Sequence, residues 1–293
     1  AIPLRRSLSH LPHRPRTSPQ PGAALAHMTV AVVAAPEASP ALRQAAGIAG
    51  TGHQLWHAAS LFAAFLRDDL ASGAGSQPPP PPEAAAGRRR KAPAPQRHVL
   101  ELGAGTGGLA IELAQGGLAS AITATDGEPA VVRNMKYNVQ ANRLGHTVRC
   151  RQWAWGQEPP KDLDLSGVDL CIGTEVVYYN RPHADLAAAL RTVLDAPRAP
   201  GQPPIRALLL LTVRMAEDQG GRVVHRPNAE GYTGSSIEHF VEVELPEQLL
   251  RAERVQIPAE AFDGCLCPLA RSIYEDPEVR EALVLYEVFS QCA

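Results

Sequence analysis

The sequence predicts an α/β fold in which a mainly parallel sheet is covered by helices on both faces. From residue 98 onward, short apolar runs of strand length alternate with segments of helical periodicity, which is the pattern of consecutive βαβ units. The run at 205–213 is rich in leucine without polar alternation, as expected for a strand buried on both faces. A chain of 293 residues with 45% hydrophobic content is long enough to bury one large core.

The same patterns place the elements in order along the chain. A first helix is expected within 47–70, where apolar residues recur at helical spacing. The expected strands are 98–102, 121–126, 147–152, 168–173, 205–213, 251–257 and 282–289, and the expected helices are 107–113, 128–141, 182–194 and 236–243. The last two strands suit an antiparallel pair. On the helix at 128–141 we expect Asn134 and Asn138 to face solvent.

A cluster of glycines follows the strand at 98–102. Gly103, Gly105 and Gly108 stand where a strand turns into a helix, and glycine there lets the backbone adopt positive φ and approach a ligand closely. Asp126 closes the next strand, where a carboxylate can accept hydrogen bonds from two ribose hydroxyls. The spacing also fits G-x-G-x-x-G. From these residues, two cofactor classes stay open: a nicotinamide or flavin dinucleotide, and S-adenosylmethionine.

Three motifs together resemble the class I, seven-β-strand methyltransferases: Glu-Leu-Gly-Ala-Gly-Thr-Gly at 101–107, Thr-Asp-Gly-Glu at 125–128 and Ile-Gly-Thr-Glu-Val-Val-Tyr at 172–178. Within that class the chain is similar to the methyltransferase family 16 group, which contains the calmodulin-lysine and valosin-containing-protein-lysine methyltransferases. Gly52-x-x-x-Trp56 and Trp155-Gly156 match that group as well, and the matches follow the family's order. The resemblance implies a Rossmann-like seven-stranded sheet, S-adenosylmethionine as cofactor, and methylation of a lysine side chain in a protein substrate.

The resemblance also implies roles for single residues. The expected cofactor-binding residues are Trp56, Glu101, Gly103, Ala104, Gly105, Gly107, Asp126, Trp155 and Thr174. Trp155 is the candidate for the adenine site, because an indole offers a flat face and a polar edge beside a purine. Glu175 is expected to orient the acceptor amine and Tyr178 to form a wall of its pocket. The family more often has Asp at the position of Glu175. A purely structural role stays open for Trp155, Glu175 and Tyr178. For Trp56, packing in the core and contact with the cofactor are equally expected and compatible.

Other functions are weighed against this interpretation. Methyl transfer needs alignment and exclusion of water rather than a covalent nucleophile, which agrees with a sequence without a G-x-S-x-G elbow, a catalytic-cysteine signature or a Walker lysine. The alternatives are a methyltransferase for protein arginine or histidine or for a small nitrogen compound, and a cofactor-binding interaction protein without catalysis. A dehydrogenase would need a second constellation, such as a Tyr and Lys pair, that the sequence does not offer.

No metal site is expected. Cys265 and Cys267 are spaced too tightly for a zinc knuckle. His53 and His57 have the spacing of a zinc helix, but Gln54 replaces the glutamate of H-E-x-x-H. Five scattered cysteines without a C-x-x-C pair fit reduced thiols in a cytosol-like compartment.

Two segments differ from the rest in composition, and they divide the predicted chain. Residues 1–46 are expected to be a disordered, basic and Pro-rich arm, and residues 47–293 to be the methyltransferase domain with a disordered Pro- and Arg-rich insert at 72–97. Residues 1–36 contain no acid, so an organelle transit peptide is an alternative, and Met28 is a candidate start site.

The basic cluster at 88–91 is interpreted as a solvated charge run rather than a nuclear signal. The polar loop at 214–232, with Gly220 and Gly221, is a candidate substrate lid, although an ordinary solvated connection is the favoured interpretation.

The charge and hydropathy of the chain argue against nucleic acid and membrane as partners. A net charge of -2 and a pI near 6.6 give no support to nucleic-acid binding, which needs clustered Lys and Arg. No apolar run approaches the roughly 18 residues of a transmembrane helix. We therefore expect a monomer in the cytoplasm, with an organelle or the nucleus as alternatives.

Overall fold

The computed structural model describes residues 57–72, 97–177, 183–213, 216–217, 223–224 and 236–291. Its centre is a seven-stranded sheet in the order β3-β2-β1-β4-β5-β9-β8. The strands of this sheet are β1 (His98–Leu102), β2 (Ala121–Asp126), β3 (Val148–Gln152), β4 (Leu170–Thr174), β5 (Arg206–Thr212), β8 (Leu250–Val255) and β9 (Leu283–Ser290). The first five pair in parallel, and β9 is antiparallel to both of its neighbours. The predicted fold class, including the antiparallel last pair, is confirmed.

The strand order reverses between β1 and β4. From β1 the chain moves outward through β2 to β3 and then returns to place β4 on the other side of β1. In open α/β sheets, ligands bind beyond the carboxyl ends of the strands at such a switch point. The topology therefore directs attention to the segments that follow β1, β2 and β4.

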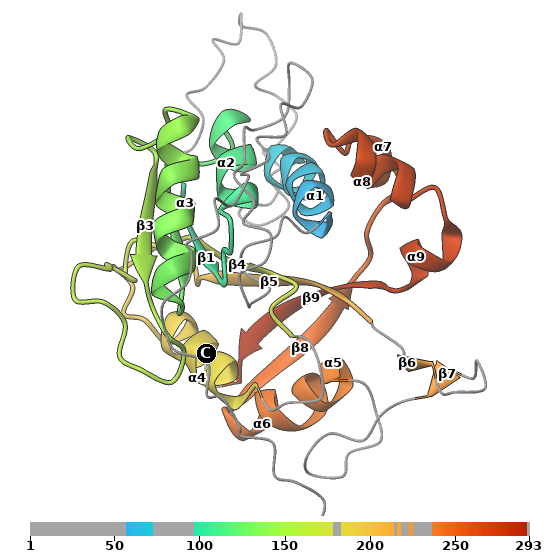
Figure 1. Cartoon of the computed structure of the whole chain (residues 1–293). Coiled ribbons are helices and arrows are strands. Elements are labelled where there is room, and N and C mark those ends of the chain that lie inside the picture. The colour runs from blue at the N-terminus through green and yellow to red at the C-terminus, as the bar shows by residue number, and fades with distance from the viewer. Residues whose placement is uncertain are drawn as a thin grey trace, which may run out of the picture.

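Helices cover both faces of the sheet (Figure 1). One face carries α1 (Ala58–Ser72), α2 (Gly108–Gln115) and α3 (Pro129–Ala141). The other carries α4 (Ala184–Leu194), α5 (Ser236–His239), a π-helical turn η3 (Phe240–Glu244) and α6 (Leu245–Glu247). Each face has its own apolar core: Phe62 and Leu66 of α1 are fully buried in the first, and Leu186 and Leu190 of α4 in the second.

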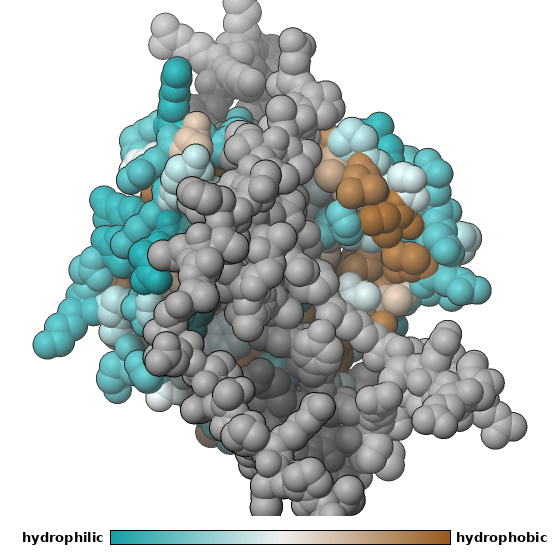
Figure 2. Space-filling model, in the orientation of Figure 1, coloured by the Kyte–Doolittle hydropathy of each residue, from teal (hydrophilic) through white to brown (hydrophobic). Residues whose placement is uncertain are grey.

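Three short helices between β8 and β9 were not predicted. They are α7 (Ala259–Asp263), α8 (Pro268–Ile273) and α9 (Pro277–Glu281), and they begin where β8 ends, beside α1 (Figure 1). Because β8 is antiparallel to β9, which is itself antiparallel to β5, β8 runs in the direction of β5. The insertion therefore lies at the carboxyl edge of the sheet. Figure 2 shows apolar atoms gathered over this region, where Leu266 and Leu269 are exposed.

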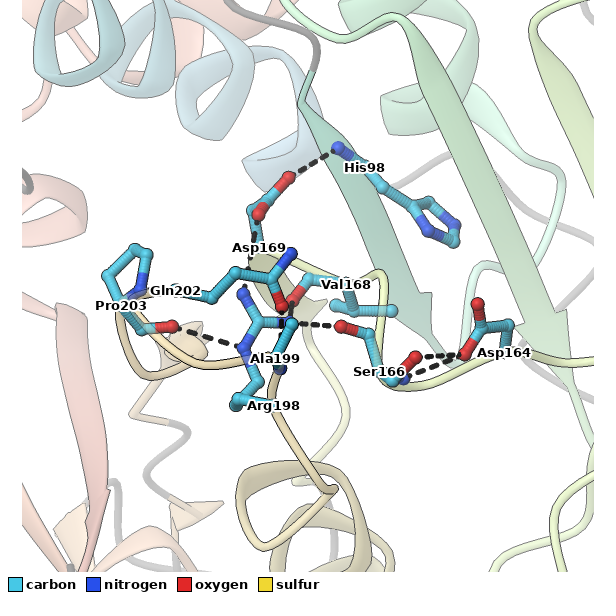
Figure 3. Close-up of polar contacts among 9 residues, drawn as sticks. All are labelled: His98, Asp164, Ser166, Val168, Asp169, Arg198, Ala199, Gln202 and Pro203. Atoms are coloured by element: carbon cyan, nitrogen blue, oxygen red, sulfur yellow. Dashed lines mark hydrogen bonds and ion pairs between the residues drawn. The ribbon is translucent and has the colours of Figure 1, made fainter.

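The opposite, amino edge is tied together by polar contacts around Arg198 (Figure 3). Its Nη1 donates to the carbonyl oxygens of Ser166 and Val168, each at 2.6 Å, and its Nη2 forms an ion pair with Asp169 Oδ1 at 3.5 Å. Asp169 Oδ2 in turn accepts a hydrogen bond from the backbone N–H of His98 at 2.9 Å. These contacts join the starts of β1 and β4 and the segment before β5.

Several predictions concern residues that the structure does not describe, among them the arm at 1–46, the insert from 73 to 96, Trp56 and Tyr178. Of the loop at 214–232, it describes only β6 (Ala216–Glu217) and β7 (Val223–Val224), which pair with each other. None of the helices in the described ranges is long and apolar enough to cross a membrane.

Candidate active site

The glycine turn after β1 has the backbone conformation that its residues predict. Gly103, Gly105 and Gly107 have φ values of 65°, 55° and 80°, in the left-handed region that glycine adopts without steric cost. The N–H of Ala104 donates to the carbonyl oxygen of Thr125 at 2.8 Å, which ties the turn to the end of β2. Gly107 then caps the N-terminus of α2.

Gly103 is also closely surrounded by side chains. A Cβ atom at this position would lie 2.8 Å from Val176 Cγ1 and 3.2 Å from Cζ2 of Trp155. The turn, the loop after β3 and the segment after β4 therefore meet here, although they are far apart in sequence. The six-membered ring of Trp155 packs against the turn.

Asp126 is held beside the same turn. Its Oδ2 accepts a hydrogen bond from the N–H of Gly105 at 3.1 Å, and its Oδ1 accepts one from the N–H of Glu128 at 3.1 Å. These two bonds fix the orientation of the carboxylate. The predicted ribose-binding acid therefore lies at the end of β2, beside the glycine turn.

Three buried polar atoms near this edge have no hydrogen-bond partner among the described residues: Oε2 of Glu101, Nε1 of Trp155 and Oγ1 of Thr174. They come from β1, from the loop after β3 and from the end of β4. Buried polar atoms in proteins almost always have a partner, so a set of orphaned donors and acceptors indicates a polar ligand. Within the described ranges no three His, Cys, Asp or Glu residues are grouped so as to hold a metal ion. The set fits an organic cofactor with amine, carboxylate and ribose groups.

Burial also changes the acidity of Glu101. The pKa of its carboxyl group is raised from 4.5 to about 8, mainly by loss of hydration. A hydrogen bond from the backbone of Ala110 lowers this pKa in part, and the negative charge of Asp126 contributes to the increase. The cofactor-free protein therefore favours a protonated Glu101 near neutral pH. A cationic group placed beside it would favour the ionised form.

Glu175 lies directly after β4, in an unusual backbone conformation. It has φ of 57°, which is uncommon for a residue other than glycine and concentrates at functional sites. Its side chain is buried, and its Oε1 accepts a hydrogen bond from the hydroxyl of Thr212 at 2.6 Å. Its backbone N–H donates to the carbonyl oxygen of Leu210 at 2.9 Å. The carboxylate is thus held at the ends of β4 and β5, one residue from the Val176 side chain that contacts the glycine turn.

Thr212 was not singled out from the sequence. Its position as the last residue of β5, next in the sheet to the strand that ends before Glu175, is the signal that could have identified it. The longer side chain of glutamate, compared with the family's usual aspartate, reaches this neighbouring strand. Thr212 is therefore the hydrogen-bonding partner that the sequence left open.

The expectation for Asn134 and Asn138 was wrong. Both side chains are buried, and Nδ2 of Asn138 donates to the carbonyl oxygen of Thr106 in the glycine turn at 2.9 Å. The side of α3 that carries them also carries Met135, which is fully buried. Their one-turn spacing beside an apolar stripe was the available signal. The inward orientation of Asn138 gives the Thr106 carbonyl a hydrogen-bond donor.

A second buried polar cluster holds the start of α4. Both carboxylate oxygens of Glu244 accept a hydrogen bond from the backbone N–H of His183, at 2.8 and 2.9 Å, and Nδ1 of His239 lies 3.2 Å from Glu244 Oε1. All three side chains are buried. Because Glu244 is 61 residues from its partner, no local sequence pattern could have shown this contact.

The structure thus brings together most of the predicted site. Glu101, the glycine turn, Asp126, Trp155, Thr174 and Glu175 converge at the carboxyl edge around the switch point, whereas Trp56 and Tyr178 lie outside the described residues. The individual roles in binding and catalysis remain predictions.

The fold and site define an α/β enzyme of the class that binds a nucleoside-containing cofactor. The defining features are a glycine turn after β1, an acid at the end of β2 and a buried acid after β4. A family described as lysine methyltransferase matches residues 38–199, and the chain belongs to that family. This confirms the resemblance found in the sequence. It also decides between the two cofactor classes, because a methyltransferase of this family uses S-adenosylmethionine.

The individual proteins that resemble this chain share 28% or less of its sequence over the matched residues. The calmodulin-lysine N-methyltransferase of Arabidopsis thaliana is 28% identical over 106 residues, which is 35% of this chain and 34% of that protein, so the match spans about a third of the relative's length. Among solved structures, geranyl diphosphate C-methyltransferase from Streptomyces coelicolor overlaps with a TM-score of 0.44 at 15% identity, covering 79% of this chain and 77% of that one. The glycopeptide N-methyltransferase MtfA, complexed with sinefungin, overlaps with a TM-score of 0.41 at 14% identity, covering 67% and 81%.

Proposed function

We propose that this protein transfers a methyl group from S-adenosylmethionine to the side-chain amine of a lysine in a protein substrate. Membership of the lysine methyltransferase family supports the reaction class. The observation that carries the proposal is the placement of Glu175: a buried, oriented carboxylate whose neighbour Val176 contacts the glycine turn. An acceptor amine held by Glu175 would thus lie beside the cofactor site.

The residues that would hold the cofactor lie on the glycine turn, at the ends of β1, β2 and β4, and in the loop after β3. Asp126 would accept the ribose hydroxyls, and Glu101 and Thr174 would bind polar groups at the other end of the molecule. Trp155, packed on Gly103, would cover the adenine and offer its Nε1–H. The bound cofactor supplies an activated methyl group on a positively charged sulfur.

The protein's part in the reaction is to present a neutral amine in line with that methyl group. A lysine ammonium has a pKa near 10.4 in water, so it must lose a proton before its lone pair can attack. Removal from water at a buried site favours the neutral amine. Glu175 accepts a hydrogen bond from the amine and fixes its direction, while Thr212 keeps the carboxylate from rotating. Alignment of this kind is worth several orders of magnitude in rate.

The test is to incubate the full chain with methyl-labelled S-adenosylmethionine and a cell lysate, and to map the labelled residue by mass spectrometry. The proposal predicts label on lysine; label on arginine, histidine or a small amine identifies one of the alternatives. Glu175→Gln should lose most of the transfer while binding S-adenosylhomocysteine like the unmodified protein. Binding of S-adenosylhomocysteine without any transfer would instead support an interaction protein.

We further propose that the protein acts as a monomer in the cytoplasm and does not bind nucleic acid. The support is a slightly acidic composition and cysteines that are free within the described ranges. Size-exclusion chromatography with light scattering tests the monomer, and microscopy of the tagged full chain tests the compartment. A mobility-shift assay with DNA and RNA tests the third statement.

A further inference from the structure

Tyr274 is a buried tyrosine in the insertion between β8 and β9, directly after α8. Its ring packs edge-on against the ring of Phe262, with ring centroids 5.8 Å apart, and its carbonyl oxygen accepts a hydrogen bond from Nε of Arg280. The Cζ atom of Arg280 lies 4.8 Å from the centroid of the Phe262 ring. The ring and the backbone of Tyr274 are therefore held in place, whereas none of the hydrogen bonds in the described ranges involves its hydroxyl group.

The insertion is attached near the carboxyl ends of β4 and β5, beside α1 (Figure 1). The backbone N–H of Cys267 donates to Oγ of Ser60 in α1 at 3.2 Å, and α1 itself packs against β4 and β5. Where the insertion ends, the carbonyl oxygen of Ala282 accepts a hydrogen bond from the N–H of Val213 at 2.7 Å. Val213 directly follows the threonine whose hydroxyl orients Glu175. The insertion therefore begins at the end of β8 and ends beside the predicted acceptor site.

The charge of Glu175 acts on the hydroxyl group of Tyr274. Burial raises the pKa of this hydroxyl above its ordinary value of 10, and the nearby Cys265 and Glu175 raise the pKa further. Glu175 is the acid that contributes, although Glu275 and Asp276 follow Tyr274 in the chain and are exposed. Because the interaction between two charges weakens with distance, the hydroxyl lies on the side of the insertion that faces Glu175.

We propose that Tyr274 is a further residue of the acceptor site, where its hydroxyl group accepts a hydrogen bond from the lysine amine that Glu175 also holds. The inference rests on the proposed function and deepens it by naming a second group that orients the amine. A neutral amine has two N–H donors and one lone pair. One acceptor lets the amine rotate about a single hydrogen bond, whereas two acceptors fix the direction of the lone pair and leave it free to attack.

The hydroxyl of Tyr274 acts as an orienting group and not as a base. Because its pKa lies above the ordinary value of a tyrosine, the hydroxyl stays protonated and neutral at physiological pH. Its oxygen can accept a hydrogen bond from the amine while its own proton is donated to an acceptor such as the Glu175 carboxylate. The ring is already fixed by Phe262 and by the backbone contact with Arg280, so little side-chain entropy is lost when the substrate binds.

The variant Tyr274→Phe removes the hydroxyl group and keeps the ring, so it tests the hydroxyl alone. With saturating methyl-labelled S-adenosylmethionine and a cell lysate as the source of acceptors, the rate of transfer to the labelled lysine should fall about tenfold, as expected for the loss of one hydrogen bond. The affinity for S-adenosylhomocysteine and the free energy of unfolding in urea should stay close to those of the unmodified protein. Tyr286→Phe is the matched control, because Tyr286 packs in the apolar core of the other face of the sheet, and its transfer rate should not change.

A second measurement does not depend on transfer. The chain has six tyrosines, and labelling with 3-fluorotyrosine gives each of them a fluorine signal in the nuclear magnetic resonance spectrum. The signal that is missing in Tyr274→Phe identifies Tyr274, and the signal that is missing in Tyr286→Phe identifies Tyr286. In the complex with S-adenosylhomocysteine, Glu175→Gln should shift the signal of Tyr274 and leave that of Tyr286 in place. An unchanged Tyr274 signal overturns the inference, because the hydroxyl and Glu175 then do not share a site.

The outcomes separate this inference from the proposed function. Transfer to lysine at an unchanged rate in Tyr274→Phe overturns the inference and leaves the proposed function intact. A fall in rate that Tyr286→Phe shows equally, or that is matched by a loss of S-adenosylhomocysteine affinity, also overturns it, because the effect is then structural. A tenfold fall in transfer to an arginine, a histidine or a small amine supports Tyr274 as an acceptor-site residue and contradicts methylation of lysine. Absence of transfer to any acceptor contradicts both.

Discussion

Replacing Glu101 with Gln should change how the stability of the cofactor-free protein depends on pH. Burial raises the pKa of this carboxyl group to about 8 in the folded state, whereas in the unfolded chain it has its ordinary value of 4.5. Between these values the folded protein holds a proton that the unfolded chain has released. The contribution of the proton to stability is complete below pH 4.5 and is lost as the pH rises through about 8.

The size of the effect follows from proton linkage. One proton taken up on folding lowers the free energy of unfolding by about 1.4 kcal/mol for each rise of one pH unit. Between pH 5.5 and 7.5 the unmodified protein should therefore lose about 3 kcal/mol through Glu101, a large part of the stability of an ordinary domain. Gln has the same shape and does not titrate, so Glu101→Gln should not show this loss.

The assay is urea unfolding followed by tryptophan fluorescence at pH 5.5, 6.5 and 7.5, without cofactor. It gives the slope of the free energy of unfolding against pH for the unmodified protein and for Glu101→Gln. Glu247→Gln, which changes an exposed carboxylate of α6, should keep the slope of the unmodified protein. If the unmodified protein and Glu101→Gln change in parallel with pH, the carboxylate is ionised in the folded state, and the reasoning from burial is wrong.

Three further changes test the parts of the site. Gly103→Ala should lower the free energy of unfolding in urea by about 2 to 4 kcal/mol, because residue 103 has positive φ and the added Cβ would be crowded by its neighbours. Gly117→Ala is the control: residue 117 has φ of 63° but no atom within 4 Å of the added Cβ, so the free energy of unfolding should fall by only about 1 kcal/mol. Asp126→Ala should weaken S-adenosylhomocysteine binding by about 1.5 to 3 kcal/mol in calorimetry, and unchanged affinity would exclude the ribose contact. Glu244→Gln replaces one of the two carboxylate oxygens that accept the hydrogen bond of the His183 N–H, so the free energy of unfolding should fall by about 1 to 3 kcal/mol. An unchanged free energy of unfolding would mean that this contact does not stabilise the protein.

The strands and the larger helices could be predicted because their signals are local. The apolar runs of β1, β4 and β5 have no polar alternation, which fits burial on both faces, and their predicted bounds differ from the observed ones by no more than two residues. The short helices α7, α8 and α9 could not be predicted from periodicity, because a helix of five or six residues is too short to show it. Prolines at the first turn, Pro268 and Pro277, were the signals available.

The same distinction between local and long-range signals applies to the residues of the site. Gly103, Asp126 and Glu175 could be found because each lies at the end of a strand or directly after one, and the topology brings these strand ends together. The contacts that orient these residues could not be found. The bond from Thr212 to Glu175 and the bidentate acceptance by Glu244 join segments that are 37 and 61 residues apart, and only the folded chain shows them. The inward orientation of Asn138 depends on a turn carbonyl that no helical pattern reveals.

The position of β9 has a consequence for how the chain is made. It is the latest of the seven strands in sequence, yet it lies between β5 and β8 and bonds to both. While the ribosome is still completing this segment, β5 has an uncovered edge and β8 has no neighbour to hold it. The half of the sheet that contains β8 therefore cannot assemble before β9 has been made, and β5 exposes an aggregation-prone edge until that strand inserts.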